Sequence, residues 1–406
     1  MSGFLSSRVA RYLSALAYVL FGAMVTGCWD ATEVNRLAIV SMSGWDLIAP
    51  HPHFKILGTV SIAKPSQLGG PNQASPAGST QGYLVEEGPG STIADAFANI
   101  QRQTSRRLYI AHRDVAIVGE PYAKSGVFDL MDEMARNPES RLRTFVLVAH
   151  HSRAADIVRL PYALNRLPSD AVVEMEQSGR MSPITAKEFI QRASGLGDPY
   201  MMGIGTLPTI GEKETKTIEV RDVALFHKYR LVGWLTGREA DGFLLAEGTL
   251  TANSDTFSVP GLPGKLTALL AQLHVDRHVR WVRDRPRVSL DVHMEDDIME
   301  DDAGINLHLP QQEKRVQVAL EQSLRRTILN VFHALQVTYR VDCLDLADQL
   351  YRNAPAKWLR IEPSWPTLYA QLPISIEVHV ILRRSGQIGP SIQALTKPRE
   401  LVSERG

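Results

Sequence analysis

Cys28 is the residue whose surroundings indicate the clearest chemistry, the covalent attachment of a lipid. It closes the stretch Val25-Thr26-Gly27-Cys28, which follows a basic segment with Arg8 and Arg11 and the apolar run Leu13 to Val25. A run of this length suits a signal peptide and is too short to span a bilayer comfortably. Small residues let a peptidase accept an extended backbone, and the thiolate is the nucleophile that takes up the lipid. The sequence predicts a cleaved lipoprotein signal over residues 1–27 and an S-diacylglycerol on Cys28, to which an N-acyl chain can be added.

Lipid anchoring and net charge together limit where the mature chain can lie and what it can bind. A diacylglycerol supplies two acyl chains, and each methylene buried in the membrane contributes about 0.8 kcal/mol of binding free energy. We therefore expect the mature chain to be stably attached to the outer side of a cytoplasmic membrane. Loss of residues 1–27 removes two of the 44 basic side chains and none of the 44 acidic ones, leaving a net charge near −2. This near-neutral charge argues against binding to nucleic acid and against electrostatic binding to anionic lipid. The alternative is an uncleaved anchor or an ordinary secretory signal with a chance cysteine.

The second cysteine, Cys343, lies in the apolar stretch Val341 to Leu346. The chain contains two cysteines, so modification of Cys28 leaves Cys343 without a partner for an intramolecular disulfide. We expect Cys343 to be a buried small hydrophobic residue and not a reactive thiol.

Two short motifs imitate catalytic sequences and fail on their context. His112-Arg113-Asp114 resembles the catalytic loop of protein kinases, but Gly119 stands where that loop needs an asparagine. We expect these residues to start a strand and to form a local ion pair. Ser61-Ile62-Ala63-Lys64 fits the Ser-x-x-Lys motif of penicillin-recognising enzymes, but it ends a strand before Pro65, whereas that motif opens a helix.

Two sets of candidate metal ligands lack the spacing of known sites. The runs Glu295-Asp296-Asp297 and Glu300-Asp301-Asp302 have no glycine-punctuated calcium spacing, so we expect a solvated acidic turn. The pairs His51/His53 and His150/His151 lack the further ligands that zinc needs, so we expect surface or packing histidines. With no nucleophile–base pair in view, the sequence predicts no enzyme activity, no metal site and no cofactor.

Strands and helices alternate in the first half of the mature chain, which predicts an α/β layer structure. The predicted strands are Leu37 to Gly44, Phe54 to Ile62, Val115 to Val118 and Thr144 to Val148. The predicted helices follow a capping pair of Thr92 and Asp95, begin again near Val127, and begin a third time near Arg153. Pro, Gly, Ser, Asn and Gln dominate Pro65 to Gly82, so a mobile loop is expected there.

The second half is richer in strand patterns and is predicted to be α+β. The predicted strands are Val223 to Phe226, Leu231 to Trp234, Leu273 to Val282, Val288 to Met294 and Ile374 to Leu382. Apolar residues from Val316 to Leu335 recur every three or four positions and predict one long amphipathic helix.

Glycines between 195 and 205 and the charged run Glu212 to Lys216 indicate a boundary between the halves. We therefore expect a multi-domain ectodomain with an α/β domain over 28–210, a domain of antiparallel sheet plus long helix over 220–390 that can divide into two, and a tail over 391–406.

Five segments of the chain resemble the Ger(x)C family, the lipoprotein C subunits of bacterial spore germinant receptors. They are Cys28 to Val40, Arg106 to His112, Asn137 to Arg143, Leu231 to Leu235 and Arg383 to Gly386. They occur in the family's order through the mature chain. The chain departs from the family where Ser41 to Asp46 replaces a glycine-rich stretch and where Ala31-Thr32 replaces an acidic–basic pair.

The resemblance implies a non-enzymatic subunit on the outer face of the spore inner membrane. It implies two integral-membrane partners, subunits A and B, and a role in sensing nutrients that start germination. Two rival classes remain open. A solute-binding lipoprotein of a transporter would show two similar α/β lobes, and a lipid-anchored hydrolase would need the nucleophile or metal motif that the sequence lacks.

Overall fold

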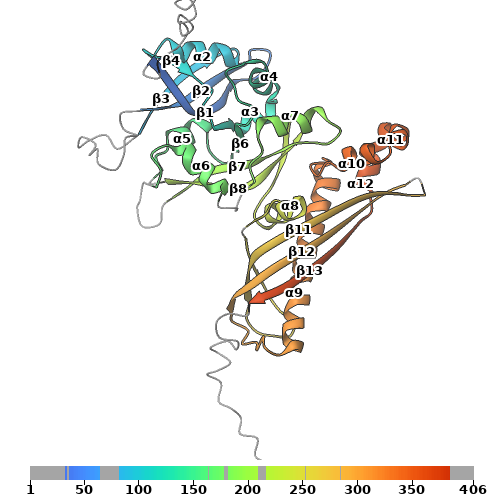
Figure 1. Cartoon of the computed structure of the whole chain (residues 1–406). Coiled ribbons are helices and arrows are strands. Elements are labelled where there is room, and N and C mark those ends of the chain that lie inside the picture. The colour runs from blue at the N-terminus through green and yellow to red at the C-terminus, as the bar shows by residue number, and fades with distance from the viewer. Residues whose placement is uncertain are drawn as a thin grey trace, which may run out of the picture.

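Two β-sheets organise the part of the chain that the structure describes. The computed structural model describes residues 33, 36–64, 82–162, 164–177, 182–208, 216–251, 253–283 and 285–384. The first sheet belongs to the N-terminal half, and the second sheet with its long helix lies beyond α8 (Arg238–Glu247), as Figure 1 shows. Cys28, residues 65–81 of the expected loop and the expected tail over 391–406 lie outside the described residues.

The first sheet has nine strands in the order β3-β2-β1-β5-β6-β7-β8-β9, with β4 paired to the start of β1. The strands are β1 (Leu37–Ala49), β2 (Lys55–Ala63), β3 (Tyr83–Gly90), β4 (Arg107–Tyr109), β5 (Val115–Gly119), β6 (Phe145–Ala149), β7 (Tyr200–Pro208), β8 (Lys216–His227) and β9 (Arg230–Leu235). The central strands β1, β5, β6 and β7 run parallel, and antiparallel strands flank them on both sides. Every residue of β5 is buried, which is typical of a parallel strand covered on both faces.

Helices cover both faces of this sheet. They are α2 (Ile93–Gln101), α3 (Glu120–Ser125), α4 (Phe128–Arg136), α5 (Ala154–Arg159), α6 (Pro168–Gln177) and α7 (Ala186–Ser194). Neighbouring side chains of a strand point to opposite faces. A Cβ on Gly44 would lie 3.0 Å from Val158 of α5, whereas Trp45 packs edge-on against Phe97 of α2 with ring centroids 5.1 Å apart. Helices α5 and α2 therefore lie on opposite sides of β1, and the predicted α/β organisation of this half is confirmed.

The second sheet follows the order β10-β11-β12-β13. Its strands are β10 (Ser254–Phe257), β11 (Leu266–Val282), β12 (Arg285–Asp301) and β13 (Ile374–Arg384). β11 and β12 pair antiparallel as predicted, and β10, which was not predicted, pairs antiparallel with β11. β13 is parallel to β12, so the prediction of an antiparallel sheet is wrong for this pair. The helices between β12 and β13 carry the chain back to the end at which β12 starts, and such a crossover produces a parallel pair.

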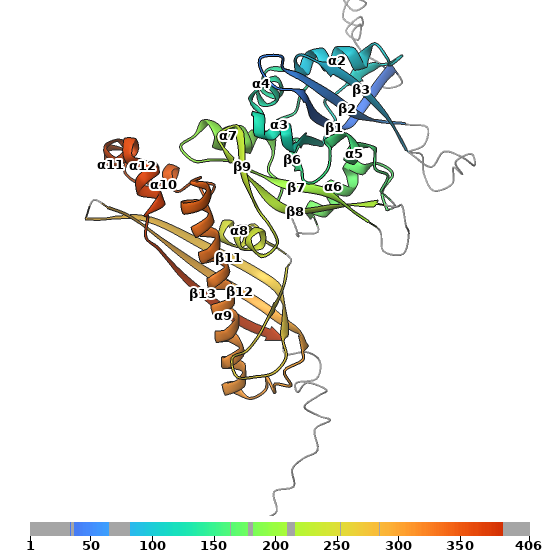
Figure 2. The same ribbon diagram turned by 180° about the vertical axis from the view of Figure 1, so that it is seen from behind.

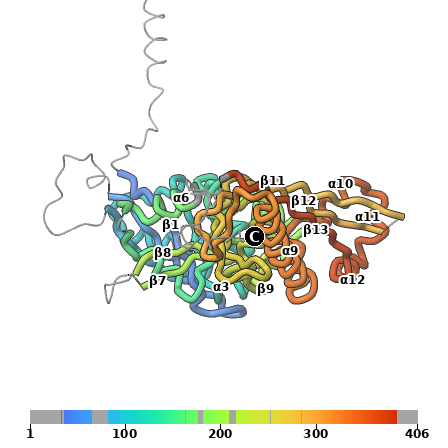
Figure 3. Tube along the Cα trace, turned by 90° about the horizontal axis from the view of Figure 1, so that it is seen from below, coloured from blue at the N-terminus to red at the C-terminus, as the bar shows by residue number. Residues whose placement is uncertain are grey.

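The long helix α9 (Pro310–His333) packs across the second sheet, as Figure 2 shows. Its buried residues include Val316, Leu320, Leu324, Ile328 and Val331, so the predicted amphipathic helix is confirmed. It begins earlier than predicted, at Pro310, because proline suits the first turn of a helix. The chain continues through η3 (Ala334–Tyr339), α10 (Leu346–Asn353), α11 (Pro355–Ile361), η4 (Glu362–Ser364) and α12 (Trp365–Ala370). In Figure 3, α10, α11 and α12 lie at the end of the molecule away from β1.

The predicted boundary between the halves falls inside the first sheet. β7 and β8 pair antiparallel on the two sides of it, from Tyr200 opposite Leu225 to Pro208 opposite Lys216. Gly203 and Gly205 are part of β7. The first sheet ends with β9 at Leu235, and α8 then leads to the second sheet. The domain limits at 28–210 and 220–390 stay a prediction.

Candidate functional site at the junction of the two sheets

The predicted site residues do not converge in the described part of the chain. Cys28 lies outside it. Cys343 is fully buried, as predicted, and burial raises the pKa of its thiol well above the usual value. Ser61 is buried on β2 and lies 3.4 Å from the Ser41 hydroxyl, so its motif ends a strand as expected.

The kinase-like motif has a buried cation where we expected a local ion pair. Asp114 directly precedes β5, but Arg113 is 1% exposed and donates to Ser140 Oγ at 3.4 Å. Burial lowers the pKa of Arg113, and the nearby Glu133 opposes that effect. Arg113 therefore makes no salt bridge with Asp114 in the described structure, whereas His112 and Arg143 oppose the rise in the pKa of Asp114 that burial causes.

The two histidine pairs serve surface and packing roles, as predicted. His51 and His53 are exposed. His150 follows β6 and stacks on Trp234 with ring centroids 3.9 Å apart. Its Nδ1 lies 2.9 Å from Asp222 Oδ2, a partner that the sequence did not indicate because it is far along the chain.

The acidic run contradicts its predicted place in a solvated turn. Glu295 to Asp301 continue β12, and Asp296 is 2% exposed on its inner face. The expectation holds at Asp301, whose carboxylate accepts the backbone N–H groups of Ala303 and Gly304 in the turn that follows. The strand continues because its alternation of inward and outward residues persists through Ile298.

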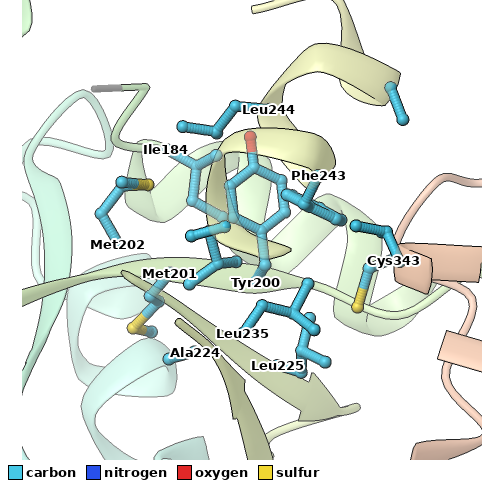
Figure 4. Packing of buried hydrophobic residues seen from close by; sticks show 14 of the residues in the cluster. Ile184, Tyr200, Met201, Met202, Ala224, Leu225, Leu235, Phe243, Leu244 and Cys343 are labelled. Carbon is cyan, nitrogen blue, oxygen red and sulfur yellow. The ribbon is translucent and has the colours of Figure 1, made fainter. Parts of the chain in front are cut away.

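The apolar core crosses from one sheet to the other. Figure 4 shows side chains of β7, β8 and β9 packed against α8 and against Cys343 from the C-terminal half. Tyr200 of β7 meets Phe243 of α8 edge-on, with ring centroids 4.9 Å apart. Both side chains are buried. The two sheets therefore share one hydrophobic core, and this junction is the candidate functional site.

Glu247, at the end of α8, connects the two sheets electrostatically. Its carboxylate accepts hydrogen bonds from Arg192 of α7 through Oε1 and from Arg277 of β11 through Oε2, the latter at 2.9 Å. Arg192 also donates to the Cys343 carbonyl at 2.9 Å, and Arg277 donates to the Leu344 carbonyl at 2.6 Å. One carboxylate and two guanidinium groups thus tie α7, α8, β11 and the chain before α10 together.

A second set of bonds joins the loop before β7 to the segment before α10. Asp198 Oδ2 accepts the N–H of Asp342 at 3.1 Å, and its Oδ1 accepts the N–H of Lys228 at 3.0 Å. The carboxylate of Asp342 accepts two N–H groups at the start of α10, from Leu346 at 3.0 Å and from Ala347 at 2.7 Å. Free amides at a helix N-terminus are natural partners of a carboxylate.

Burial perturbs the titration of the charged groups in the junction. Burial raises the pKa of Asp342 to about 7, although the two α10 amides act in the opposite direction. Burial also raises the pKa of Asp345 to about 6, against the effect of Arg192. Burial lowers the pKa of Arg192, but Glu247 and Asp345 outweigh it and raise that pKa above its usual value.

Two protein-family models match the chain, one after the other. A family model described as spore germination protein N-terminal domain matches residues 30–206, and one described as spore germination B3/GerAC-like, C-terminal, matches residues 221–386. Together the two models cover most of the chain. The chain belongs to the Ger(x)C family of spore germination proteins.

Curated relatives and a solved structure agree with this assignment. The Ger(x)C chain is 24% identical to the putative spore germination protein YfkR of Bacillus subtilis (strain 168) over 92% of its own length and 97% of the relative's. It is 25% identical to spore germination protein KC of the same organism over 93% and 97%. The crystal structure of the GerBC protein matches 84% of this chain and 97% of that one, with a TM-score of 0.54 and 14% identity, and so shares the fold.

One segment that carries the Ger(x)C resemblance lies in the junction. Within Leu231 to Leu235, a Cβ on Gly233 would lie 1.9 Å from the ring of Tyr339, which comes from η3 in the C-terminal half. The Tyr339 hydroxyl donates to the carbonyl of Trp234 at 3.0 Å. The glycine is needed because an aromatic ring of the second half lies directly on the β9 backbone. This contact fastens β9 of the first sheet to the C-terminal half.

Proposed function

We propose that this Ger(x)C chain is the lipid-anchored, non-enzymatic C subunit of a spore germinant receptor. It acts with integral-membrane subunits A and B on the outer face of the spore inner membrane, in germination triggered by nutrients. The observation that carries the proposal is the pair of family matches, which follow one another through both halves. The curated relatives are spore germination proteins aligned over nearly their whole length, which supports the same reading.

The architecture supports an assembly subunit over a solute-binding lipoprotein of a transporter. Such a lipoprotein has two similar lobes around a hinge. Here a nine-stranded and a four-stranded sheet differ in topology and are fastened by Glu247 and Asp198. Within the described ranges, no helix has the length and apolar character to cross a membrane. A joint that is packed and hydrogen-bonded in this way suits a subunit that presents both halves to its partners as one unit.

Lipid attachment is tested by metabolic labelling with a radioactive fatty acid. Cys28→Ala should abolish incorporation of the label, because no neighbouring side chain can form the thioether. Cys343→Ala is the matched control, since it removes the other cysteine of the chain and should leave labelling unchanged. Label retained in the Cys28→Ala protein would overturn the lipid anchor.

The receptor role is tested in spores of the organism that carries the chain. Deletion should abolish the response to the nutrients of one receptor and spare germination through unrelated routes. An affinity tag on the chain should co-purify the A and B subunits from spore membranes. Normal germination with every nutrient after deletion, or a tag that brings down neither subunit, would contradict the proposal.

A further inference from the structure

A cavity of about 270 Å³ lies in the C-terminal half, between α8, α9 and the strands β10, β11 and β12. Leu245, Leu324 and Met294 line it with hydrocarbon. Asp241 and Asp255 add carboxyl groups to the same wall. The cavity is remote from the Cys28 anchor in sequence and is separate from the charged groups of the junction. A small organic molecule fits a space of this size, because engineered cavities of about 150 Å³ already hold benzene.

Asp296 is the least expected residue of the lining. It lies on the inner face of β12 beside Met294 and is 2% exposed. Its Oδ2 is buried and has no hydrogen-bond partner among the described residues. A buried carboxylate oxygen without a partner costs several kcal/mol in a folded protein unless something satisfies it. The neighbouring Asp297 points to the other face, where Arg383 lies 3.6 Å away.

The cavity carries an excess of negative charge. Arg238 donates to Asp255 Oδ1 at 2.9 Å, but Asp255 Oδ2 is also buried without a partner among the described residues. Asp241, Asp255 and Asp296 thus face a single lining arginine. Burial raises the pKa of each of these three carboxyls, and that of Asp296 reaches about 7 with further contributions from Asp255 and Asp297. One arginine cannot balance three carboxylates, so the lining carries more negative than positive charge when they are ionised.

The geometry favours an organic cation over a metal ion. Among the residues that the structure describes, no three His, Cys, Asp or Glu side chains stand close enough to hold one metal. A protonated primary amine needs one carboxylate and offers three N–H donors. Such charge-assisted bonds are about twice as strong as neutral ones. Its hydrocarbon part gains from burial against leucine and methionine side chains.

We propose that this cavity binds a small primary amine, whose ammonium group pairs with Asp296 and whose apolar body packs against α8 and α9. Asp296 must be ionised to pair, so affinity rises with pH from about 6 to 8 as the carboxyl loses its proton. Asp241, Asp255, Asp297 and Arg238 are the charged groups that share this environment. The proposal is independent of the receptor role, since the test uses purified protein and no spores.

The test is isothermal titration calorimetry on the full chain in a nonionic detergent, with three probes of one carbon skeleton. Isopentylamine, 3-methylbutan-1-ol and isovalerate differ in charge and share their apolar body. We expect saturable binding of the amine, at least tenfold weaker binding of the alcohol and no binding of the carboxylate. Equal affinity for amine and alcohol, or no saturable heat with the amine at millimolar concentration, would overturn the proposal.

Two variants assign the binding to the cavity. Asp296→Asn should weaken amine binding at least tenfold, leave alcohol binding unchanged and abolish the pH dependence. Asp291→Asn is the matched control, because Asp291 lies on the same strand but points to the opposite face, toward His278. The amine should raise the thermal unfolding midpoint of the parent and of Asp291→Asn, since a ligand stabilises the state it binds. An equal rise in Asp296→Asn would contradict the assignment.

Discussion

Two buried acidic clusters in the described part of the chain differ in how their oxygens are satisfied. In the junction, both oxygens of Glu247 meet guanidinium groups, and both oxygens of Asp342 accept amides of α10. In the cavity, Asp296 and Asp255 each have a buried oxygen without a partner among the described residues. Removal of a carboxylate from water has a similar cost in both places. The two clusters differ because the chain supplies the partner in one and not in the other.

This difference separates a structural role from a binding role. A buried ion pair adds little net stability, but loss of one member leaves an unpaired charge and is strongly destabilising. The junction should therefore be sensitive to any substitution that removes a partner. In the cavity, the unpaired carboxylate of Asp296 lowers the free energy of unfolding. Removal of that charge should therefore stabilise the protein. Each of the following predictions tests one side of this contrast.

The largest effect is expected for Glu247→Ala in the junction. The substitution leaves Arg192 and Arg277 buried without their shared carboxylate, and such losses cost about 3–5 kcal/mol of unfolding free energy. Urea denaturation of the purified chain measures the change. The control is Glu239→Gln, an exposed position on the same helix, which should change stability by less than about 0.5 kcal/mol. Similar effects of the two variants would show that Glu247 does not fasten the sheets.

Gly233→Ala should be next in size. The new Cβ would lie 1.9 Å from the Tyr339 ring, so the ring or β9 must move. Overpacking of this kind costs about 1–3 kcal/mol. In a Tyr339→Ala background, the same glycine substitution should cost less than about 0.5 kcal/mol, because the obstructing ring is gone. If the losses of unfolding free energy from Gly233→Ala and Tyr339→Ala add up in the double variant, the new Cβ does not clash with the Tyr339 ring.

Sequence patterns indicated most of the strands but not the direction of every strand. Alternation predicted the strand that became β13, yet alternation is the same in parallel and antiparallel pairs, so the parallel pairing with β12 was missed. The long helical stretch between these strands is the signal that could have revealed it. β12 was cut short at Met294 because an aspartate at the next inward position breaks the apolar pattern. Ile298, which restores the pattern, marks the continuing strand.

The junction and the cavity could not be derived from local sequence. Glu247 meets Arg192 and Arg277 from positions far away along the chain, and spacing rules apply within one helix or one strand. The prediction of a solvated acidic turn missed the burial of Asp296 because acidic residues are nearly always exposed. The Ger(x)C resemblance located Gly233 in a shared segment, but only the fold shows the ring of Tyr339 against it.

On the cavity side, Asp296→Asn should stabilise the protein at neutral pH. The pKa of Asp296 is about 7 in the folded chain and near 4 in the unfolded chain. The stability that this difference contributes is fully present below pH 4 and is lost as pH rises through about 7. Neutralisation should therefore raise the unfolding free energy at pH 8 by about 1–3 kcal/mol and leave it nearly unchanged at pH 4. Asp342, with a pKa of about 7, keeps part of the pH dependence in the variant. Asp291→Asn is the control, and a loss of stability in Asp296→Asn at pH 8 would contradict an unpaired charge.

The smallest effect is expected for Thr185→Ala, at the start of the helix that carries Arg192 to the junction. Thr185 Oγ1 accepts the N–H of Glu188 at 3.3 Å, and Glu188 Oε2 accepts the N–H of Thr185 at 2.7 Å. Loss of such a cap costs about 1 kcal/mol. Thr92→Ala removes the equivalent cap of α2, which lies far from the junction, and should cost a similar amount.

Hydrogen exchange distinguishes these two caps where global stability does not. If the junction depends on α7 being in place, Thr185→Ala should accelerate exchange of the Asp342 amide, which donates to Asp198 across the junction, and Thr92→Ala should leave it protected. Equal protection in both variants would mean that Arg192 stays in place without a stable α7, and that Asp198 with the shared core is sufficient to hold the sheets together.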